Sequence, residues 1–158
     1  MAVLGLDELK RRLKPGERLL GLDLGEKTIG LALSDTLLTV ATPFKTLKRG
    51  KFTTDAKALK ALMAEHGVGG LIVGLPLNMD GSEGPAAQSA RAFGRNLGQV
   101  SDCPVAFSDE RLSTAAVTRT LLAANASRAK RKEVVDKMAA AYILQGALDK
   151  LRHLPPIP

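Results

Sequence analysis

The chain has 158 residues, of which 45% are hydrophobic, 3% aromatic and 25% charged, as expected for one compact soluble domain with an aliphatic core. Its single cysteine, Cys103, excludes an internal disulfide and a multi-cysteine metal site. The net charge of +7 suits a polyanionic partner such as nucleic acid, but such an excess is also common in proteins that bind none, so the arrangement of acids and bases decides more. We find no run of about 20 apolar residues that would span a membrane and no signal peptide, so we expect a cytoplasmic protein.

The first part of the chain predicts a short helix and three neighbouring strands. A polar helix is expected over residues 6–13 and ends before the Pro15-Gly16 break. The strands are expected over residues 18–24, 28–33 and 38–46, with a turn at 25–27 that returns the second strand beside the first. Pro43 cannot donate to a strand ladder, so we expect the third strand at an edge of the sheet.

The rest of the chain alternates helices and strands. In order, we expect a helix capped by Asp55 and ending at His66-Gly67, a strand over 71–75, a helix over 86–97, a strand over 105–107, a helix over 113–125, a basic loop and a last helix over 134–151. This order predicts an α/β fold, with a mixed sheet of three adjacent antiparallel strands plus parallel strands and with helices on its faces. No repeat or linker divides the sequence, so residues 1–158 are expected to form a single domain.

Asp23 interrupts an apolar run of leucines. In an extended strand its side chain shares a face with Leu19, Gly21 and Gly25, and the two glycines leave space for a ligand to approach the backbone. A buried carboxylate needs a cation or hydrogen bonds. We interpret Asp23 as a functional acid; the alternative is a turn acid that accepts hydrogen bonds from nearby backbone amides.

Two further acids occupy positions of the same kind. Glu110 follows a short strand, and strand ends are where ligand sites assemble in open α/β sheets; the alternative is a simple ion pair with Arg111. Asp136 lies four residues before Ala140 and extends the buried stripe of the last helix; the alternative is an acid that the helix dipole stabilises. If the three carboxylates converge at one end of the sheet, their oxygens suit Mg²⁺ or Mn²⁺ rather than zinc.

Basic residues lie close to these acids in the sequence. Lys27 follows Asp23 in the turn, and Arg111 adjoins Glu110. Four more precede the last helix, namely Arg128, Lys130, Arg131 and Lys132. We expect all six to bind nucleic-acid phosphates; the alternative for the segment 128–132 is a solvated surface loop.

Four ordered segments resemble the YqgF-type family of pre-16S rRNA nucleases, also described as Holliday-junction-resolvase-like proteins. They are GLDLGEKTIGLALSD (21–35), GLPLNMDGSEGPAAQ (74–88), DERLST (109–114) and KEVVDKMAAAYILQ (132–145). The resemblance covers about residues 18–151. It implies a ribonuclease-H-like fold, phosphodiester hydrolysis with a divalent metal, and a cytoplasmic role in ribosome biogenesis through maturation of the 5′ end of 16S rRNA.

The resemblance also bears on single residues. It implies that Asp23, Glu110 and Asp136 occupy the three acidic positions of the site, which agrees with the choice made from their surroundings. One departure concerns the first segment, where Thr28 follows Lys27 although the family often has two basic residues in this region. That departure affects an expected phosphate contact and not the metal site.

Alternative functions come from three other classes. A Holliday-junction-type DNA resolvase and a non-catalytic nucleic-acid-binding module, whose acids are structural, would share the same fold and charge. The strand-turn-strand around Asp23 also resembles the first phosphate loop of actin-like kinases, but that fold needs two such domains, and the sequence has no Walker-type phosphate loop. We expect the partner to be nucleic acid, either pre-rRNA or branched DNA, with no membrane, and the protein to be a monomer or a weak homodimer.

Overall fold

The computed structural model describes residues 5–78, 80–109 and 128–153, with the backbone alone for 128–136. The described elements are α1 (Leu6–Arg12), β1 (Arg18–Leu24), β2 (Thr28–Ser34), β3 (Ala41–Lys48), α2 (Phe52–His66), β4 (Val68–Leu75), α3 (Pro85–Val100), β5 (Val105–Asp109) and α5 (Arg128–Arg152). None of the helices in these ranges is both long and apolar enough to cross a bilayer. The helix expected over 113–125 lies outside the described residues.

The strands form one mixed sheet in the order β3-β2-β1-β4-β5. β2 pairs antiparallel with both β1 and β3, whereas β4 pairs parallel with both β1 and β5. This topology confirms the predicted mixed α/β sheet and the edge position of the strand that contains Pro43. β1, β4 and β5 all finish at the same end of the sheet, which we call the C-terminal edge.

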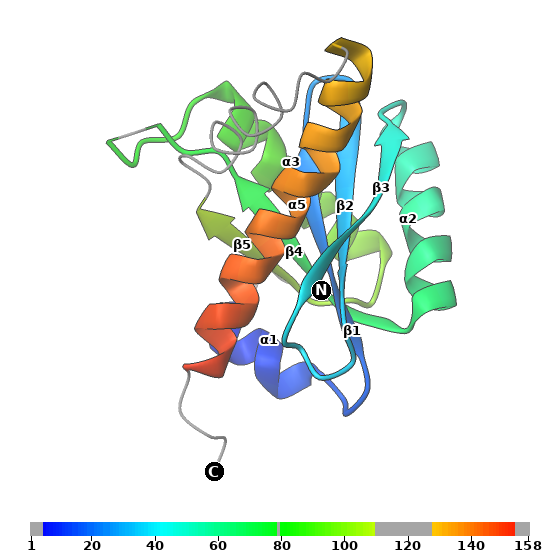
Figure 1. The fold of residues 1–158 in the computed structure, drawn as a ribbon, viewed down its shortest axis with the longest axis vertical. Helices are drawn as coiled ribbons and strands as arrows, with labels where there is room; N and C mark the ends of the chain where they lie inside the picture. Colours follow the sequence, from blue (N-terminus) through cyan, green and yellow to red (C-terminus); the bar gives the residue numbers. More distant parts are fainter. Residues whose placement is uncertain (1–4, 79, 110–127, 154–158) are drawn as a thin grey trace.

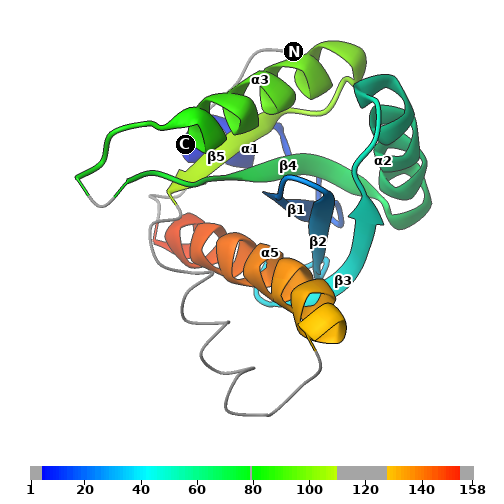
Figure 2. The ribbon, with the colours of Figure 1, turned by 90° about the horizontal axis from the view of Figure 1, so that it is seen from above.

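Helices cover both faces of the sheet (Figure 2), with α5 across one face and α2 and α3 on the other. Successive side chains of β1 pack alternately into two separate hydrophobic cores. Leu20 and Leu22 pack with residues of α2 and α3, whereas Leu19 packs with residues of α1 and α5. We call the side of the sheet covered by α2 and α3 the α3 face, and the side covered by α5 the α5 face. Because side chains alternate along a strand, each strand residue can be assigned to one of the two faces.

α5 runs antiparallel to β1 (Figure 1). A Cβ atom at Gly21 would lie 2.8 Å from the Cβ of Leu144 and 3.0 Å from the carbonyl oxygen of Ala140, so this glycine allows the helix to approach the strand closely. The expectation that Gly21 leaves space for a ligand is therefore wrong, because α5 fills that space. The end of α5 lies beside α1, where the Lys10 ammonium donates to the carbonyl oxygen of Leu151 at 3.0 Å.

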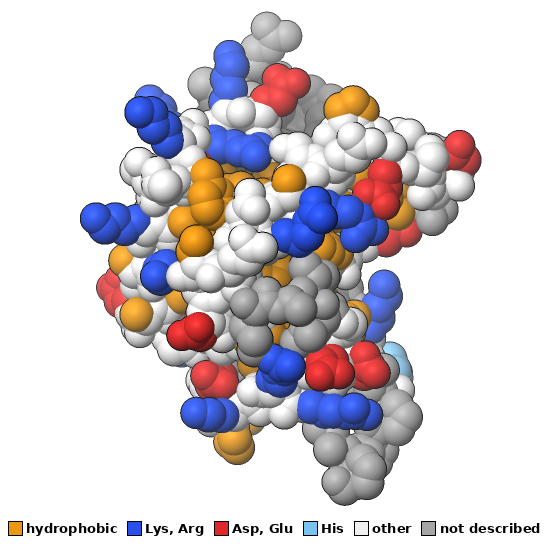
Figure 3. All heavy atoms as spheres, turned by 180° about the vertical axis from the view of Figure 1, so that it is seen from behind, with side chains coloured by type: hydrophobic (Ala, Val, Ile, Leu, Met, Phe, Trp, Pro, Cys, Tyr) orange, Lys and Arg blue, Asp and Glu red, His pale blue; other side chains and the backbone are white. Residues whose placement is uncertain are grey.

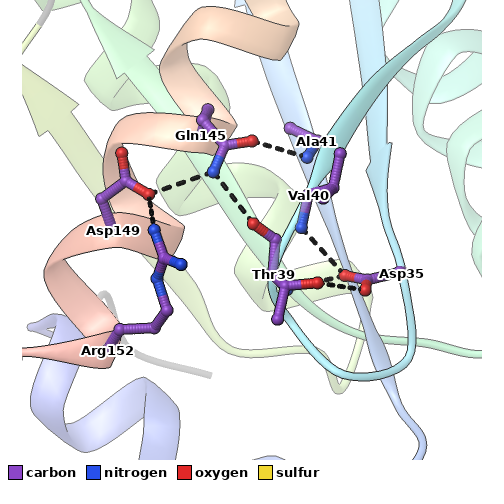
Figure 4. Close-up of polar contacts among 7 residues, drawn as sticks. All are labelled: Asp35, Thr39, Val40, Ala41, Gln145, Asp149 and Arg152. Carbon is purple, nitrogen blue, oxygen red and sulfur yellow. Dashed lines mark hydrogen bonds and ion pairs between the residues drawn. The ribbon is translucent and has the colours of Figure 1, made fainter.

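A polar network fixes α5 to the connection between β2 and β3 (Figure 4). The Gln145 side chain accepts a hydrogen bond from the Ala41 amide at 2.8 Å and donates to the Thr39 carbonyl oxygen at 3.0 Å. Within the connection, the Asp35 carboxylate accepts from the Thr39 amide and hydroxyl and from the Val40 amide. These bonds hold residues 35–40 as a loop, which is why β3 begins at Ala41 rather than at residue 38 as predicted.

Two helix starts also differ from prediction. α2 begins at Phe52, and Asp55 lies in its first turn, where both carboxylate oxygens accept from the Gly50 amide at 3.1 Å. The predicted basic loop over 128–132 is wrong, because the backbone of these residues is helical and α5 begins at Arg128. The segment contains only Ala, Arg and Lys, all good helix formers, and no glycine or proline follows it before Gly146.

Candidate active site

Asp23 lies near the C-terminal end of β1 with its carboxylate on the α5 face. The alternation along the strand places it on the same side as Leu19 and Gly21, which contact α1 and α5. The side chain is half-buried. Asp23 therefore lies at the C-terminal edge, the end of parallel strands where ligand sites form in open α/β sheets.

In each of the two strands that neighbour β1, the residue beside Asp23 is a glycine. Its Cα partner on β2 is Gly30. On β4, Gly74 follows Val73, the partner of Leu22. Because glycine has no side chain, neither neighbouring strand places a side chain beside the carboxylate at this level. Both glycines are themselves buried.

The structure describes the side chain of only one of the three predicted acids. Glu110 directly follows Asp109, the last residue of β5, and lies outside the described residues. Asp136 lies in the helical backbone of α5, and its side chain is also outside the described part. The convergence of the three carboxylates therefore remains a prediction.

The described backbone is compatible with that convergence. From Ala140 back to residue 136, α5 rises by about 6 Å, and from Gly21 to Asp23, β1 advances by about 6.6 Å. Both steps run toward the C-terminal edge, since the helix and the strand are antiparallel and are in contact at Gly21. β5 finishes at the same edge, and Gly74 pairs with its Ser108. An ion held here would meet oxygen donors, which matches the preference of Mg²⁺ and Mn²⁺.

Of the predicted basic residues, only Lys27 has a described side chain. It is exposed in the turn that follows Asp23. Arg128, Lys130, Arg131 and Lys132 lie on the helical backbone of α5, and Arg111 lies outside the described residues.

The sequence analysis missed three basic residues at the C-terminal edge. Lys48, Arg49 and Lys51 follow one another closely where β3 ends and α2 begins. Lys48 pairs with Thr28 across the strands, and the Arg49 amide donates to the Lys27 carbonyl oxygen at 2.8 Å. The signal was available, because a third antiparallel strand must end beside the turn between the first two.

Arg49 anchors the turn that follows Asp23. Its Nη1 donates to the carbonyl oxygen of Gly25 at 2.7 Å and its Nη2 to the Ser89 hydroxyl of α3 at 3.4 Å. The guanidinium also lies 5.5 Å from the ring centroid of Phe93, a favourable cation–π distance. The Arg49 side chain thus connects the turn after Asp23 to α3, which lies on the face of the sheet away from the Asp23 carboxylate.

The connection between β4 and α3 is ordered at the same edge by its own hydrogen bonds. The Asn78 amide donates to the Ser82 carbonyl oxygen at 2.9 Å, and the Ser82 amide donates to the Asp80 carboxylate at 2.9 Å. After the connection, Arg91 of α3 pairs with Glu83 at 2.6 Å. This segment is part of the motif 74–88, and its bonds explain the Asn, Asp and Ser residues there.

Lys and Arg side chains gather at the upper left of the molecule in Figure 3, at the end that carries the C-terminal edge.

The groups with shifted pKa values discussed next lie away from Asp23. The pKa of Asp35 is lowered, chiefly by the hydrogen bond from the Thr39 hydroxyl, and Asp35 follows β2 at the end of the sheet opposite Asp23. Burial raises the pKa of the Cys103 thiol to about 12, so this thiol is protonated at neutral pH and is a poor metal ligand.

Comparisons with known proteins agree with one another. A family model described as "RuvX: Holliday junction resolvase" matches residues 17–150. A protein of Paramagnetospirillum magneticum named "Putative pre-16S rRNA nuclease" is 62% identical over 149 residues, which cover 94% of this chain and 96% of that protein. A protein of Jannaschia sp. with the same name is 59% identical over 152 residues, which cover 94% and 95%.

Among solved structures, T. thermophilus RuvC in complex with Holliday junction substrate superposes with a TM-score of 0.52 at 13% identity, covering 87% of this chain and 96% of that one. At this identity the likeness concerns the fold alone, and it confirms the predicted ribonuclease-H-like architecture. The family model spans most of the chain and the relatives align along nearly their whole length. The chain therefore belongs to the RuvX family, the YqgF-type family whose motifs its sequence carries.

Proposed function

We propose that this protein is a metal-dependent nuclease that hydrolyses phosphodiester bonds of structured nucleic acid and processes the 5′ end of pre-16S rRNA in ribosome biogenesis. One observation carries the proposal. Asp23 presents a half-buried carboxylate at the C-terminal edge, between Gly30 and Gly74 of the adjacent strands, in a chain of the RuvX family. The rRNA substrate is supported by the names of relatives that share 62% and 59% of their residues with this chain.

The proposed metal ligands are Asp23 from β1, Glu110 after β5 and Asp136 from α5. Their carboxylates are hard oxygen donors that fit Mg²⁺ or Mn²⁺. When bound, such an ion supplies Lewis-acid stabilisation of the phosphate and lowers the pKa of a bound water. β1 fixes the position of Asp23 through its ladders with β2 and β4, so this ligand needs little reorganisation.

The basic residues have a separate role in the proposed reaction. Lys27 would bind a phosphate beside Asp23, and Arg111 would do so beside Glu110. Further phosphate contacts would come from the start of α5, through Arg128, Lys130, Arg131 and Lys132. With pre-rRNA as the substrate, the protein would act in the cytoplasm, as a monomer or a weak homodimer.

A second candidate function is resolution of Holliday junctions. It is favoured by the description of the family model and by the fold shared with T. thermophilus RuvC. Resolution requires two symmetric cuts in a four-way DNA junction, and a two-fold dimer would supply the two sites. Pre-rRNA processing requires one cut by one site. The oligomeric state under cleavage conditions therefore helps to separate the two functions.

Cleavage of a labelled substrate panel tests the proposal. The panel contains a precursor 16S rRNA fragment with its 5′ extension, the mature-length fragment, a four-way DNA junction and linear duplex DNA, each with Mg²⁺, Mn²⁺ or EDTA. We expect metal-dependent cleavage at the 5′ extension of the precursor. Faster cleavage of the junction would favour the resolvase. Binding without cleavage under all metal conditions would favour a non-catalytic module.

A further inference from the structure

We propose that Lys27, Lys48 and Lys51 form a phosphate-binding surface on the β3 side of Asp23, which holds the nucleic-acid strand next to the cleavage point. We call these three residues the lysine patch. The proposal rests on the proposed nuclease function and adds the surface along which the substrate would lie. It involves a different part of the molecule from the basic residues at the start of α5.

The sheet register brings the patch together. Lys48 and Thr28 are Cα partners, and Lys27 precedes Thr28 in the chain. The Arg49 amide donates to the Lys27 carbonyl oxygen at 2.8 Å, which fixes the end of β3 against the turn. Lys51 follows at the start of α2, which begins at Phe52. Backbone hydrogen bonds and strand pairing therefore position all three lysines.

Lys48 lies on the same face of the sheet as Asp23. Its neighbour Leu47 packs into the core of the α3 face, so the alternation along β3 directs Lys48 to the α5 face. Asp23 pairs with Gly30, and Gly30 pairs with Thr46, two residues before Lys48. Two strand spacings and two residues separate the Cα atoms of Asp23 and Lys48 by roughly 12 Å.

That separation suits a nucleic-acid strand. Phosphates advance by about 3.4 Å per nucleotide along the axis of a duplex and lie farther apart along the strand itself, so roughly 12 Å spans a few nucleotides at most. A strand with its scissile phosphate at Asp23 would place following phosphates over the patch. Of the strand residues in between, Gly30 is buried and Thr28 is half-buried, and the described ones include no acidic side chain.

The charges of the patch are available to a ligand. Lys27, Lys48 and Lys51 are all exposed, and none of them forms an ion pair with a described side chain. Some other cations of the described part are engaged, since Arg91 pairs with Glu83 and Arg152 with Asp149.

Two acids lie near the patch, fewer than its three lysines. Asp55 is buried, and its two carboxylate oxygens share the one N–H of Gly50. Glu26 in the turn is the acidic neighbour of Lys27 in the sequence and is exposed. The patch therefore retains an excess of positive charge at the edge where Asp23 lies, as phosphate binding requires.

Two matched triple variants test the proposal. The patch variant carries Lys27→Gln, Lys48→Gln and Lys51→Gln. The control variant replaces three exposed lysines elsewhere, one before β1, one on α2 and one near the end of α5: Lys14→Gln, Lys60→Gln and Lys150→Gln. Both remove three positive charges. Affinity for a labelled RNA hairpin with a single-stranded 5′ extension is measured in Ca²⁺ across a salt series, together with the melting temperature.

We expect the patch variant to lower the log–log salt slope by about 2–3, from about 0.7–0.9 for each lost phosphate contact, and to raise Kd by about tenfold to a hundredfold. The control should change the slope by less than about 1, with melting temperatures equal to wild type in both. Equal losses in the two variants, or a wild-type slope in the patch variant, would overturn the proposal. Cleavage of the same hairpin by wild type in Mn²⁺ reports separately on the nuclease function, so a patch effect without cleavage supports the surface and counts against the enzyme.

Discussion

The Arg49 guanidinium donates to the carbonyl oxygen of Gly25 at 2.7 Å, across the turn that separates Asp23 from Thr28. The same group reaches Ser89 of α3 and lies over the ring of Phe93. Gly25 in turn donates from its amide to the Thr28 carbonyl oxygen at 2.8 Å. The turn after the proposed metal ligand is thus held from both sides by hydrogen bonds.

Replacing Arg49 with Ala should destabilise this turn. A hydrogen bond from a charged donor to a carbonyl contributes about 1.5–3 kcal/mol when well formed, and the side chain is only half-buried, so we expect a loss of about 1–2 kcal/mol. For a chain of this size that corresponds to a fall of about 2–8 °C in melting temperature. Arg49→Lys keeps the charge but loses the two-nitrogen contact to Gly25 and Ser89, so it should recover only part of the stability.

The same two variants also test whether Arg49 affects metal binding at Asp23 or only the stability of the fold. If the turn positions Asp23, the Mn²⁺ concentration that gives half-maximal cleavage should rise in Arg49→Ala even at temperatures well below its melting point. Cleavage titrations with Mn²⁺ measure this shift, and Lys14→Ala, a change at the opposite end of the sheet, serves as the control. An unchanged metal requirement together with a lowered melting temperature would limit Arg49 to a structural role.

A methyl group at Gly21 should disturb the contact between β1 and α5. The added Cβ would lie 2.8 Å from the Cβ of Leu144 and 3.0 Å from the Ala140 carbonyl oxygen. Overpacking of this kind costs about 1–3 kcal/mol. Chemical denaturation of Gly21→Ala measures the loss. The control is Gly146→Ala in the same helix, where a Cβ meets nothing within 4 Å and where removing a helical glycine should stabilise by about 0.5–1 kcal/mol. Equal stability of the two variants would contradict the contact.

Much of the fold follows from local patterns in the sequence. The leucine-rich run around Asp23, the turn at 25–27 and Pro43 were enough to predict a hairpin and an edge strand, because period-two burial and turn chemistry are local properties. The boundary of β3 was not predictable in this way. It depends on the Asp35 carboxylate, which captures the Thr39 and Val40 amides, and on Gln145 of a distant helix.

The candidate site was likewise predictable only in part. Asp23 could be selected as a candidate because a charged residue in an apolar strand conflicts with the core pattern, and conflicts of this kind are expected at functional positions. The reason for its surroundings was not accessible, since Gly30 and Gly74 become its neighbours only through strand pairing. For Lys48 and Lys51 the sequence held part of the signal, because a third antiparallel strand must end beside the turn after Asp23. Their distance from Asp23 depends on the register of that strand, which a single sequence does not determine.

The Asp35–Thr39 pair makes a pH-dependent contribution to stability. Hydrogen bonds from Thr39 and Val40 lower the pKa of the Asp35 carboxyl from its ordinary value of 3.8. A carboxyl with a lowered pKa in the folded state stabilises the fold above its unfolded-state pKa, and that contribution is lost as the pH falls through the folded-state pKa. The melting-temperature difference between wild type and Thr39→Val should therefore be full near pH 6 and shrink below about pH 4. A difference that stays constant down to pH 2 would contradict this ionic contribution.

Asp23→Asn distinguishes an enzyme from a binding module. The substitution keeps the size of the side chain and removes the charge that would hold a divalent ion. We expect cleavage to collapse while the affinity for nucleic acid survives, because Lys and Arg side chains supply most of that affinity. Stability should be retained or should rise slightly, because neutralising one of the three carboxylates would relieve the repulsion that their proposed convergence creates in the absence of metal.

The measurement pairs the cleavage rate in Mn²⁺ with the Kd and the melting temperature of the same preparations. Asp35→Asn is the matched control, since it makes the same chemical change at the opposite end of the sheet, where the carboxylate accepts bonds from Thr39 and Val40. That variant should lose stability and keep its cleavage rate below its melting point. Wild-type cleavage by Asp23→Asn would remove this residue from the set of metal ligands. A large fall in its melting temperature would instead identify a structural carboxylate, and the binding-module function would then be preferred.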